Sequence, residues 1–389
     1  MSEPRKVVLL GATGSIGTNA LRILRAHPDK LQLVGASAHS NANDLLQIAE
    51  EFALKWICLT DEDAREQAAG KVPEGTELLS GSAGLEELAI LEEADVVLVA
   101  VVGAAGLSPT LAALGAGKDV ALANKEALVA GGQFVMEAAR ASGARILPTD
   151  SEHNAVFQCL GGGSTEQVEK IILTASGGPF LDWSAERMAK VTPEEALQHP
   201  NWSMGPKITV DSATMANKGL EVIEARWLFD LPPERIEVAV HPQSVAHSFV
   251  QFVDGSLVAQ LSPPSMTFAI QHALLFPDRA PGVDDTVDFT QPFSLDFQPA
   301  DLERFPCLRL AREALTAGGL GPAVFNAANE VAVEAFLENR IGFSSISRTI
   351  ERSLETMELR EPNDLNDIFA ADAEARRVAT AVAHSQKPS

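Results

Sequence analysis

Three acidic residues in two short motifs have the types and spacing of a metal site. Asp150-Ser151-Glu152 places two carboxylates two residues apart, and residues i and i+2 of an extended segment project to the same side. Two carboxylates held in this way repel each other unless a positive charge lies between them. Taken alone, the triplet fits a solvated acidic turn equally well, so the prediction depends on a third acid, Glu221.

Glu221 lies in a segment at about residues 212–229 that reads as a helix, with Asp211 or Ser212 as its N-cap. Asn217, Lys218 and Glu221 fall at positions i, i+1 and i+4 of that helix and form one polar stripe. An amide, an ammonium and a carboxylate together indicate an anion site beside a metal, and an ordinary Lys–Glu helix pair is the alternative. Oxygen ligands from three carboxylates favour Mg²⁺ or Mn²⁺ over zinc.

A glycine-rich turn near the start of the chain predicts a dinucleotide site. Gly11, Gly14 and Gly17 form a G-x-x-G-x-x-G motif that follows an apolar strand and opens an amphipathic helix. Glycines let such a turn tighten and let the backbone approach a pyrophosphate, which then binds to the helix N-terminal amides. A plain glycine-rich turn is the alternative, but the flanking strand and helix favour dinucleotide binding.

The end of the second expected strand favours NADP over NAD. Enzymes that use NAD usually carry an acid there to bind the ribose 2′-hydroxyl. In this chain the corresponding residues His39, Ser40 and Asn41 include no acid. Imidazole, hydroxyl and amide donors accommodate a 2′-phosphate that a carboxylate would repel. An exposed loop histidine without this role is the alternative interpretation of His39.

A loop at about residues 199–207 has the composition of an active-site lid. Trp202 and Met204 stand among glycine and proline between an expected helix and an expected strand, whereas loops are usually polar. Such a loop could close apolar groups over a substrate. The alternative is a loop that packs on its own domain.

The elements that must position these residues change in type along the chain. Over the first 150 residues, short apolar runs alternate with amphipathic stretches, which predicts a doubly wound parallel sheet. The central part reads as mixed α+β, with a strand at 208–210 and a hairpin signal at Asp254-Gly255. The last part reads as consecutive helices with short breaks, which form a small bundle.

The predicted fold is therefore α/β, with an N-terminal Rossmann-type parallel sheet, a central α+β catalytic domain and a C-terminal helical bundle. The expected divisions are an NADPH-binding domain at 1–149, a catalytic domain for metal and substrate at 150–282, a linker at 283–303 and a helical domain at 304–389. In the first part we expect strands at residues 6–10, 31–36, 56–59, 95–102, 119–123 and 145–147.

Composition excludes several classes of partner. The net charge of −23 argues against a nucleic-acid surface, which needs a basic field. A phosphorylated substrate must therefore be held by local donors, such as helix N-termini, hydroxyls and a few cations. No apolar run is long enough to cross a bilayer, and the first strand begins too early for a signal peptide, so we expect a soluble, cytoplasmic protein without a membrane partner. Three dispersed cysteines fit reduced thiols.

The motifs together resemble the 1-deoxy-D-xylulose 5-phosphate reductoisomerase family. The resemblance runs in order over nearly the whole chain through GATGSIG, ANKEAL, PTDSEHNA, SGGPF, HPNWSMG, ITVDSATMANKGLE, HPQSVAHS and NAANEVAVEAFL. It implies a homodimer that uses NADPH and a divalent metal to convert 1-deoxy-D-xylulose 5-phosphate, a small phosphorylated ketose, into 2-C-methyl-D-erythritol 4-phosphate. That reaction belongs to non-mevalonate isoprenoid biosynthesis.

The resemblance also implies roles for individual residues. The metal ligands would be Asp150, Glu152 and Glu221, and the catalytic set would add Lys125 and Lys218. Substrate would be contacted by Lys125, Ser151, Glu152, Ser176, His199, Ser212, Asn217, Lys218 and Glu221. The cofactor would be contacted by Gly11, Thr13, Gly14, Ser15, Ile16, Gly17, Asn41, Asn124, Glu126 and, from the lid, Gly205.

The chain departs from the family pattern at three places. His39-Ser40 replaces a glycine and a basic residue, which bears on the 2′-phosphate contact. Pro206 replaces a usually basic lid residue, and Ala216 replaces a frequent methionine beside Asn217.

Two other functions were weighed against this one. An NADP-dependent sugar-phosphate or semialdehyde dehydrogenase without rearrangement explains the first 150 residues equally well, but it needs no metal. A nucleotide-sensing regulator with a degenerate site is the non-catalytic alternative. The carboxylate trio argues against the first, and the retention of every expected carboxylate, lysine and serine argues against the second.

Overall fold

The computed structural model describes residues 3–161, 163 and 165–386, which divide into two compact units. The first unit comprises residues 1–127, 133–154 and 265–286, and the second comprises 128–132, 155–264 and 287–389. The division differs from the predicted domain boundaries: residues 150–154 and 265–286 belong to the first unit, and residues 128–132 and the C-terminal helices belong to the second.

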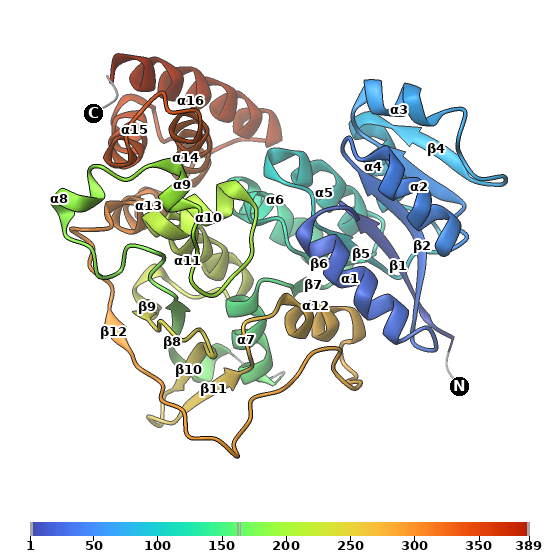
Figure 1. Ribbon diagram of the computed structural model, residues 1–389, viewed down its shortest axis with the longest axis horizontal. Coiled ribbons are helices and arrows are strands. Elements are labelled where there is room, and N and C mark those ends of the chain that lie inside the picture. Colours follow the sequence, from blue (N-terminus) through green and yellow to red (C-terminus); the bar gives the residue numbers. More distant parts are fainter. Residues whose placement is uncertain (1–2, 162, 164, 387–389) are drawn as a thin grey trace. The chain divides into compact units, whose positions relative to one another are not determined.

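A parallel sheet forms the centre of the first unit, as predicted. Within the described residues its seven strands run in the order β4-β3-β2-β1-β5-β6-β7, so the order reverses direction between β1 and β5 (Figure 1). The strands are β1 (Arg5–Leu10), β2 (Leu31–Ala38), β3 (Trp56–Leu59), β4 (Glu77–Ser80), β5 (Val96–Val99), β6 (Asp119–Leu122) and β7 (Ile146–Pro148). Strand β4 was not predicted, because its short sequence ELLS gives little hydrophobic signal, in keeping with the weak alternation of its burial.

Helices follow these strands and cover the sheet. They are α1 (Ser15–Ala26), α2 (Ala42–Glu51), α3 (Glu62–Ala68), α4 (Gly81–Ala89), the 3₁₀ turn η1 (Gly103–Gly106), α5 (Leu107–Gly115), α6 (Lys125–Ser142) and α7 (Ser151–Leu160). Helix α12 (Met266–Leu275) completes the unit beside α1 and is tied to β1, because the Arg5 guanidinium donates a 3.0 Å hydrogen bond to the Leu274 carbonyl (Figure 1).

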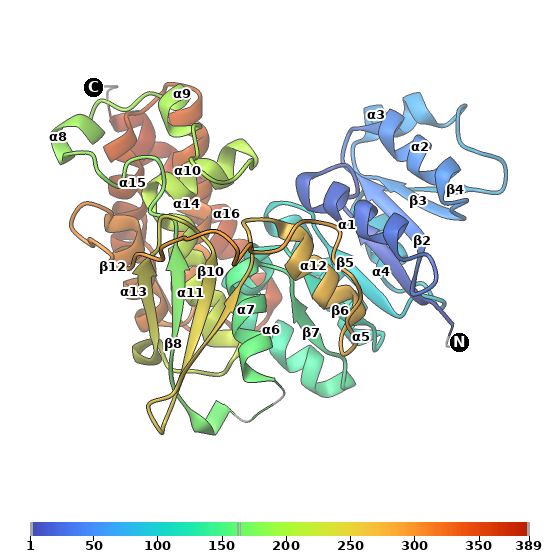
Figure 2. The ribbon, with the colours of Figure 1, turned by 60° about the horizontal axis from the view of Figure 1, so that its bottom comes forward.

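A mixed sheet is the corresponding feature of the second unit. Its order is β11-β10-β8-β9-β12, in which β8 and β9 are parallel and the other neighbours antiparallel (Figure 2). The strands are β8 (Val168–Ala175), β9 (Ile236–Val240), β10 (Ala246–Phe252), β11 (Leu257–Leu261) and β12 (Gln298–Pro299). The short helical elements around it are η2 (Thr165–Gln167), α8 (Ala185–Met188), α9 (Pro193–Ala196) and η3 (Pro233–Arg235).

The C-terminal helices share one hydrophobic core with this sheet. Ile171 and Leu173 of β8, Leu220 of α11 and Phe325 and Phe336 of α14 belong to a single buried cluster. The helices concerned are α10 (Pro206–Thr214), α11 (Ala216–Leu228), α13 (Pro306–Ala317), α14 (Gly321–Leu337), α15 (Phe343–Thr356) and α16 (Leu365–Ser385). The predicted helices of the C-terminal part are confirmed as elements.

Three local predictions around the acidic motifs are wrong. Residues 208–210 do not form a strand, because they lie inside α10; their β-branched side chains gave the misleading signal. Asp211 and Ser212 are not an N-cap, because they belong to the last turn of α10 and the chain starts α11 only after Met215, whose φ is 59°. Asp150-Ser151-Glu152 is not extended, because α7 begins at Ser151.

Candidate active site

The glycine turn lies where the strand order of the first sheet reverses. Open parallel sheets bind ligands at such a switch point, outside the carboxyl ends of the strands. A Cβ atom at Gly11, where φ is +90°, would lie 2.5 Å from the Ala100 carbonyl oxygen, and one at Gly17 would lie 2.3 Å from the Gly11 oxygen. At Gly14 the corresponding distance is 3.5 Å, an ordinary contact. Gly11 and Gly17 therefore make the turn possible, and Gly14 leaves its outer face open.

Helix α1 starts in this turn without a side-chain cap. Its N-cap residue is Gly14, which supplies no side-chain hydrogen bond. Gly14 and Ser15 are exposed, and Thr13 and Ile16 are half-buried. Unpaired N-terminal amides and the positive end of the helix dipole make such a start fit for an anion.

The end of β2 carries no acid, and its polar side chains bond to residues of neighbouring elements. His39 Nδ1 lies 2.7 Å from the Thr60 hydroxyl at the end of β3. Asn41 is the N-cap of α2: its Oδ1 accepts a hydrogen bond from the Asp44 amide, and its Nδ2 donates to the Asp44 carboxylate at 2.6 Å. The Asn41 side chain is thus engaged in capping. Asp44 brings an acid into the first turn of α2, which the sequence prediction did not consider.

Asn124-Lys125-Glu126 starts α6 on the same edge of the first sheet. Asn124 is the N-cap, and its Nδ2 donates to the Glu126 carboxylate at 2.9 Å and to two backbone carbonyls. Gly106 makes room for it, since a Cβ at that glycine would lie 2.4 Å from the Asn124 amide carbon. Gly106 was not identified from the sequence, because no motif marks a glycine that serves a side chain eighteen residues away.

Lys125 and Asp150 form an ion pair inside the first unit. The Lys125 side chain is 10% exposed and that of Asp150 is 16% exposed, so the pair is largely shielded from water. Ser151 donates a hydrogen bond to Glu152 at 2.5 Å. The structure thus brings four of the predicted residues together around the start of α7. Helical geometry replaces the predicted strand spacing as the means by which they are positioned.

Ser176 and His199 meet in the second unit, although they are 23 residues apart. The His199 Nε2 lies 3.0 Å from the Ser176 Oγ, and Nδ1 accepts hydrogen bonds from the backbone amides of Asn201 and Trp202. Because Nδ1 acts as an acceptor, the ring is neutral and carries its proton on Nε2, which donates to Ser176. Burial lowers the pKa of His199 and favours the same neutral form.

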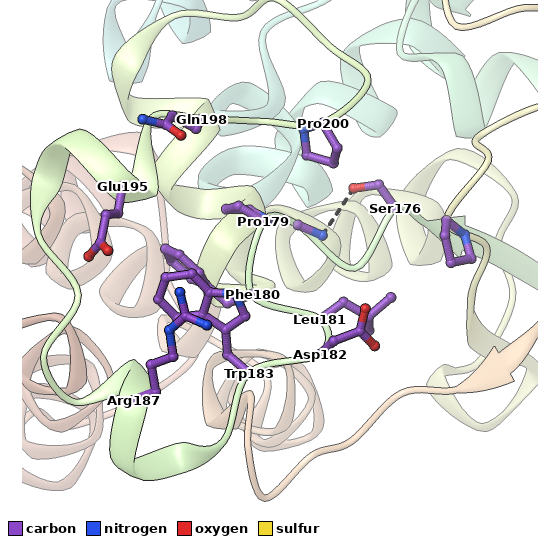
Figure 3. Close-up of a pocket in the computed structure, with 12 residues that line it drawn as sticks. Ser176, Pro179, Phe180, Leu181, Asp182, Trp183, Arg187, Glu195, Gln198 and Pro200 are labelled. Atoms are coloured by element: carbon purple, nitrogen blue, oxygen red, sulfur yellow. Dashed lines mark hydrogen bonds between the residues drawn. The ribbon is translucent and has the colours of Figure 1, made fainter.

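The Ser176 hydroxyl consequently has its own proton available for a ligand. Its oxygen accepts from His199 Nε2 and from the Gly178 amide at 3.2 Å. A hydroxyl that accepts two hydrogen bonds has one donor left. Ser176 also lines a cavity of about 520 Å³, where Pro200 lies above it and Trp183 and Arg187 lie on the opposite side (Figure 3). The Arg187 guanidinium is 3.3 Å from the centre of the Trp183 ring.

The polar stripe of α11 is confirmed, but it is buried rather than solvated. Lys218 forms an ion pair with Glu221, and Asn217 Nδ2 donates to the same carboxylate at 2.6 Å. Glu221 is 0% exposed and Lys218 is 4% exposed. A buried carboxylate needs cations and donors around it, so an ordinary solvent-facing Lys–Glu pair does not describe this site. Ser212 lies in the last turn of the preceding helix α10.

The predicted lid lies between α9 and α10. Trp202 and Met204 are half-buried, and the Trp202 ring packs edge-on against His247 with 6.2 Å between ring centres. Asn201 Nδ2 donates to the Pro242 carbonyl at 2.5 Å. Gly205 is the exposed N-cap residue of α10. The loop therefore rests on the turn between β9 and β10 and joins directly to the helix that carries Ser212.

The predicted site residues are distributed over both units. Those of the glycine turn, Asn41, the Asn124 motif and the Asp150 motif belong to the first unit, and Ser176, His199, Gly205, Ser212, Asn217, Lys218 and Glu221 belong to the second. Among the described residues, none of the helices is long and apolar enough to span a membrane.

Models of one protein family match most of the chain. The model for 1-deoxy-D-xylulose 5-phosphate reductoisomerase matches residues 7–132, and two models for C-terminal domains of the same enzyme match residues 146–229 and 261–378. A protein of this name from Burkholderia cenocepacia is 50% identical over 386 residues, covering 97% of this chain and 96% of that protein. One from Geobacillus is 51% identical over 372 residues, covering 95% and 98%.

Solved structures agree with these matches. The reductoisomerase from Zymomonas mobilis in complex with NADPH is 45% identical, covers 98% of this chain and all of its own, and superposes with a TM-score of 0.92. A reductoisomerase in complex with NADPH, fosmidomycin and magnesium is 44% identical, with 97% and 98% covered and a TM-score of 0.93. Identity of this level over the full length shows common family and fold, and the chain belongs to the 1-deoxy-D-xylulose 5-phosphate reductoisomerase family.

Proposed function

We propose that this protein catalyses the NADPH- and divalent-metal-dependent rearrangement and reduction of 1-deoxy-D-xylulose 5-phosphate to 2-C-methyl-D-erythritol 4-phosphate, in non-mevalonate isoprenoid biosynthesis. The observation that carries this function is the buried Glu221 carboxylate, held by Lys218 and Asn217 on the helix that follows Ser212. A dehydrogenase that only transfers hydride has no use for a buried acid at this place, whereas a metal-dependent rearrangement does.

In this proposal, local hydrogen-bond donors of the second unit hold the substrate phosphate. Ser176 has a free proton, which His199 and the Gly178 amide direct by occupying the acceptor sites of its oxygen. Ser212, Asn217 and Lys218 add a hydroxyl, an amide and an ammonium on α10 and α11, and α11 itself starts without a side-chain cap. Local donors of this kind bind a dianion even in a protein of net charge −23.

Asp150, Glu152 and Glu221 are the residues that would hold the metal. The donor set fits Mg²⁺ or Mn²⁺, because it offers three carboxylates and no thiol or imidazole. Asp150 and Glu152 belong to the first unit, and Glu221 belongs to the second. When bound, the ion supplies Lewis-acid polarisation of the ketose carbonyl and hydroxyl oxygens. Lys125 forms an ion pair with Asp150, and Ser151 donates a hydrogen bond to Glu152, so each of these carboxylates has a fixed partner.

The glycine turn and the start of α6 would bind NADPH. Thr13, Gly14, Ser15 and Ile16 surround the uncapped start of α1, which suits the pyrophosphate. Asn124 and Glu126 are hydrogen-bonded to each other at the start of α6, and Gly205 of the lid is the remaining proposed cofactor contact. Asn41 would act through its place at the start of α2 rather than through a free side chain.

The alternative is an NADP-dependent sugar-phosphate or semialdehyde dehydrogenase without rearrangement. NADPH oxidation by the purified protein should be followed on 1-deoxy-D-xylulose 5-phosphate, with Mg²⁺, with Mn²⁺ and after chelation of metal. The proposed function predicts turnover only with metal and a product of rearranged carbon skeleton, identified by NMR. Metal-independent reduction to an unrearranged alcohol would establish the alternative instead.

The finer assignments follow from the same function. We propose that residues 1–149 bind NADPH, that 150–282 with the lid at 199–207 form the catalytic part, and that a linker at 283–303 leads to the helical part at 304–389. We also propose a cytoplasmic homodimer. The edge strand β11 supports the dimer, because Leu257 and Val258 are 55% and 41% exposed on a strand that has no outer neighbour in the sheet within the described part of the chain. Val258→Lys should lower the mass measured by analytical ultracentrifugation from dimer to monomer.

A further inference from the structure

Asp211 is a buried acid at the centre of a short hydrogen-bond network within the second unit. Its carboxylate is 1% exposed. It accepts hydrogen bonds from Lys207 Nζ at 2.9 Å, one turn earlier on α10, and from Asn329 Nδ2 at 2.7 Å, on α14. Asn329 is itself 0% exposed. A C-terminal helix is therefore bonded directly to the helix that carries Ser212.

The hydrogen bond from Asn329 to Asp211 carries a cost in the stability of the folded protein. The other amide atom of Asn329, Oδ1, is buried without a hydrogen-bond partner among the described residues. An unsatisfied buried carbonyl destabilises the folded state. A buried ion pair is also weak evidence for a gain in stability, since well-packed apolar residues often serve as well. Hydrogen bonds are directional, whereas apolar contacts are not. The hydrogen-bonded Asp211 carboxylate therefore fixes the rotation of α10 about its axis and its position along that axis.

A close backbone contact also restricts the position of α10. Gly178 has φ +68°, and a Cβ atom there would lie 2.8 Å from the Ser212 carbonyl oxygen and 3.0 Å from the Ala213 Cα. Gly178 follows Ser176 by two residues and donates its amide to the Ser176 hydroxyl. The turn that carries one proposed phosphate donor thus lies directly against the helix that carries another.

The position of α10 is also transmitted to α11. The Thr214 hydroxyl donates to the Asp211 carbonyl at 3.2 Å and accepts from the Ala216 amide at 3.3 Å, across the bend at Met215. Asn217 follows at once in the first turn of α11. A shift of α10 would therefore alter the spacing between Ser212 and the donors on both neighbouring elements.

We propose that Asp211 and Asn329 are positioning residues, which set the spacing between Ser212 and the other phosphate donors by holding α10 to α14. This proposal rests on the proposed function, because it assumes that Ser176 and Ser212 bind the substrate phosphate. Neither residue contacts substrate. Lys207 balances the charge of Asp211, so the acid does not repel the phosphate that it helps to place.

The test is a reciprocal exchange of the two side chains. Asn329→Asp places two acids face to face, and we expect the KM for 1-deoxy-D-xylulose 5-phosphate and the inhibition constant of inorganic phosphate to rise together by about 10-fold or more, a change of about 1.4 kcal/mol in binding. The double variant Asp211→Asn with Asn329→Asp restores one acid and one amide, and it should recover most of that loss. NADPH affinity, measured by fluorescence, should stay unchanged in both.

Asn329→Leu and Asp211→Asn provide the same test with smaller perturbations if Asn329→Asp fails to fold. A purely structural role predicts a lower melting temperature with unchanged phosphate affinity in the folded protein. Folded variants that bind inorganic phosphate within twofold of wild type would overturn the proposal. If the wild-type protein turns over the substrate normally in that experiment, the proposed function stands. A wild-type protein with neither turnover nor phosphate affinity would overturn both.

Discussion

His199 connects the lid to Ser176 through the two nitrogens of one ring: Nε2 lies 3.0 Å from the serine hydroxyl, and Nδ1 accepts the amides of Asn201 and Trp202. A neutral imidazole has one donor nitrogen and one acceptor nitrogen. The bond at Nε2 therefore requires that Nδ1 is unprotonated, and the bonds at Nδ1 require that the proton is on Nε2. Protonation of Nδ1 would replace the two lid bonds by repulsion between N–H groups. The start of the lid and the orientation of Ser176 therefore depend on the same proton.

The first prediction concerns the pKa of His199. Burial lowers it from the usual 6.5. The contribution of the neutral ring to stability is therefore fully present above pH 6.5 and decreases as the pH falls below that value, since the unfolded chain then binds the proton more readily. NMR titration of the free protein should show one histidine with a pKa below 6.5 that is absent in His199→Gln. A pKa at or above 6.5 for that resonance would contradict the hydrogen-bond assignment.

The second prediction concerns the metal site. Glu221→Gln keeps the shape of the side chain and its bond to Asn217, but it removes one ligand charge from a fully buried position. We expect Mn²⁺ affinity and turnover to fall by about two orders of magnitude, as loss of one charged ligand contact of about 3 kcal/mol implies. NADPH affinity should be unchanged. Calorimetric titration of Mn²⁺ and fluorescence titration of NADPH measure the two effects. Glu234→Gln, on η3, serves as the control acid, and unchanged Mn²⁺ affinity in Glu221→Gln would refute the assignment.

The third prediction separates a lid from a packed loop. Trp202 is half-buried and contacts the His247 ring edge-on, outside the main core cluster. Trp202→Ala should lower kcat/KM by at least about 10-fold while the melting temperature changes by a few degrees at most, because few core contacts are lost. Trp183→Ala is the matched control for the loss of a packed tryptophan, since Trp183 packs against the core residue Phe180 with 4.7 Å between ring centres. A large fall in the melting temperature of Trp202→Ala would show that the loop packs as part of the domain.

The fourth prediction uses the unequal space at two glycines of the nucleotide turn. Gly17→Ala would bring a Cβ to 2.3 Å from the Gly11 oxygen, so the turn must open, and we expect NADPH affinity and thermal stability to fall together. Gly14→Ala adds a methyl group with a contact of 3.5 Å and should leave the fold intact. Differential scanning fluorimetry with and without NADPH compares the two. Equal melting temperatures for the two variants would contradict the steric argument.

The parallel sheet was predictable because its strands are short, buried and apolar on both faces. Residues 119–122 and 146–148 formed strands where expected. The region around Ser212 was not, since its β-branched run at 208–210 imitates a strand although Gly205-Pro206 is a typical helix start. The bend at Met215 left no sequence signal, because its positive φ is held by tertiary contacts rather than by glycine or asparagine.

For the candidate site, sequence motifs located the polar residues but not the geometry that positions them. Asn217, Lys218 and Glu221 were correctly placed on one helical stripe, but the burial of Lys218 and Glu221 depends on tertiary packing and cannot be read locally. The pairing of Ser176 with His199 joins two motifs through a loop, so no periodicity could indicate it. Asp211 and Asn329 are 118 residues apart, and their contact was likewise inaccessible.

The discontinuity of the first unit affects the order in which the protein can be completed on the ribosome. Residues 265–286 supply α12, and Arg5 in the first strand donates hydrogen bonds to the carbonyls of Leu274 and Phe276. All strands of this sheet emerge early from the ribosome. The first unit nevertheless lacks α12 until almost three quarters of the chain has been synthesised. During that interval the face of the sheet that α12 will cover is apolar and open, which makes it a natural point for chaperone binding and for aggregation when translation stalls.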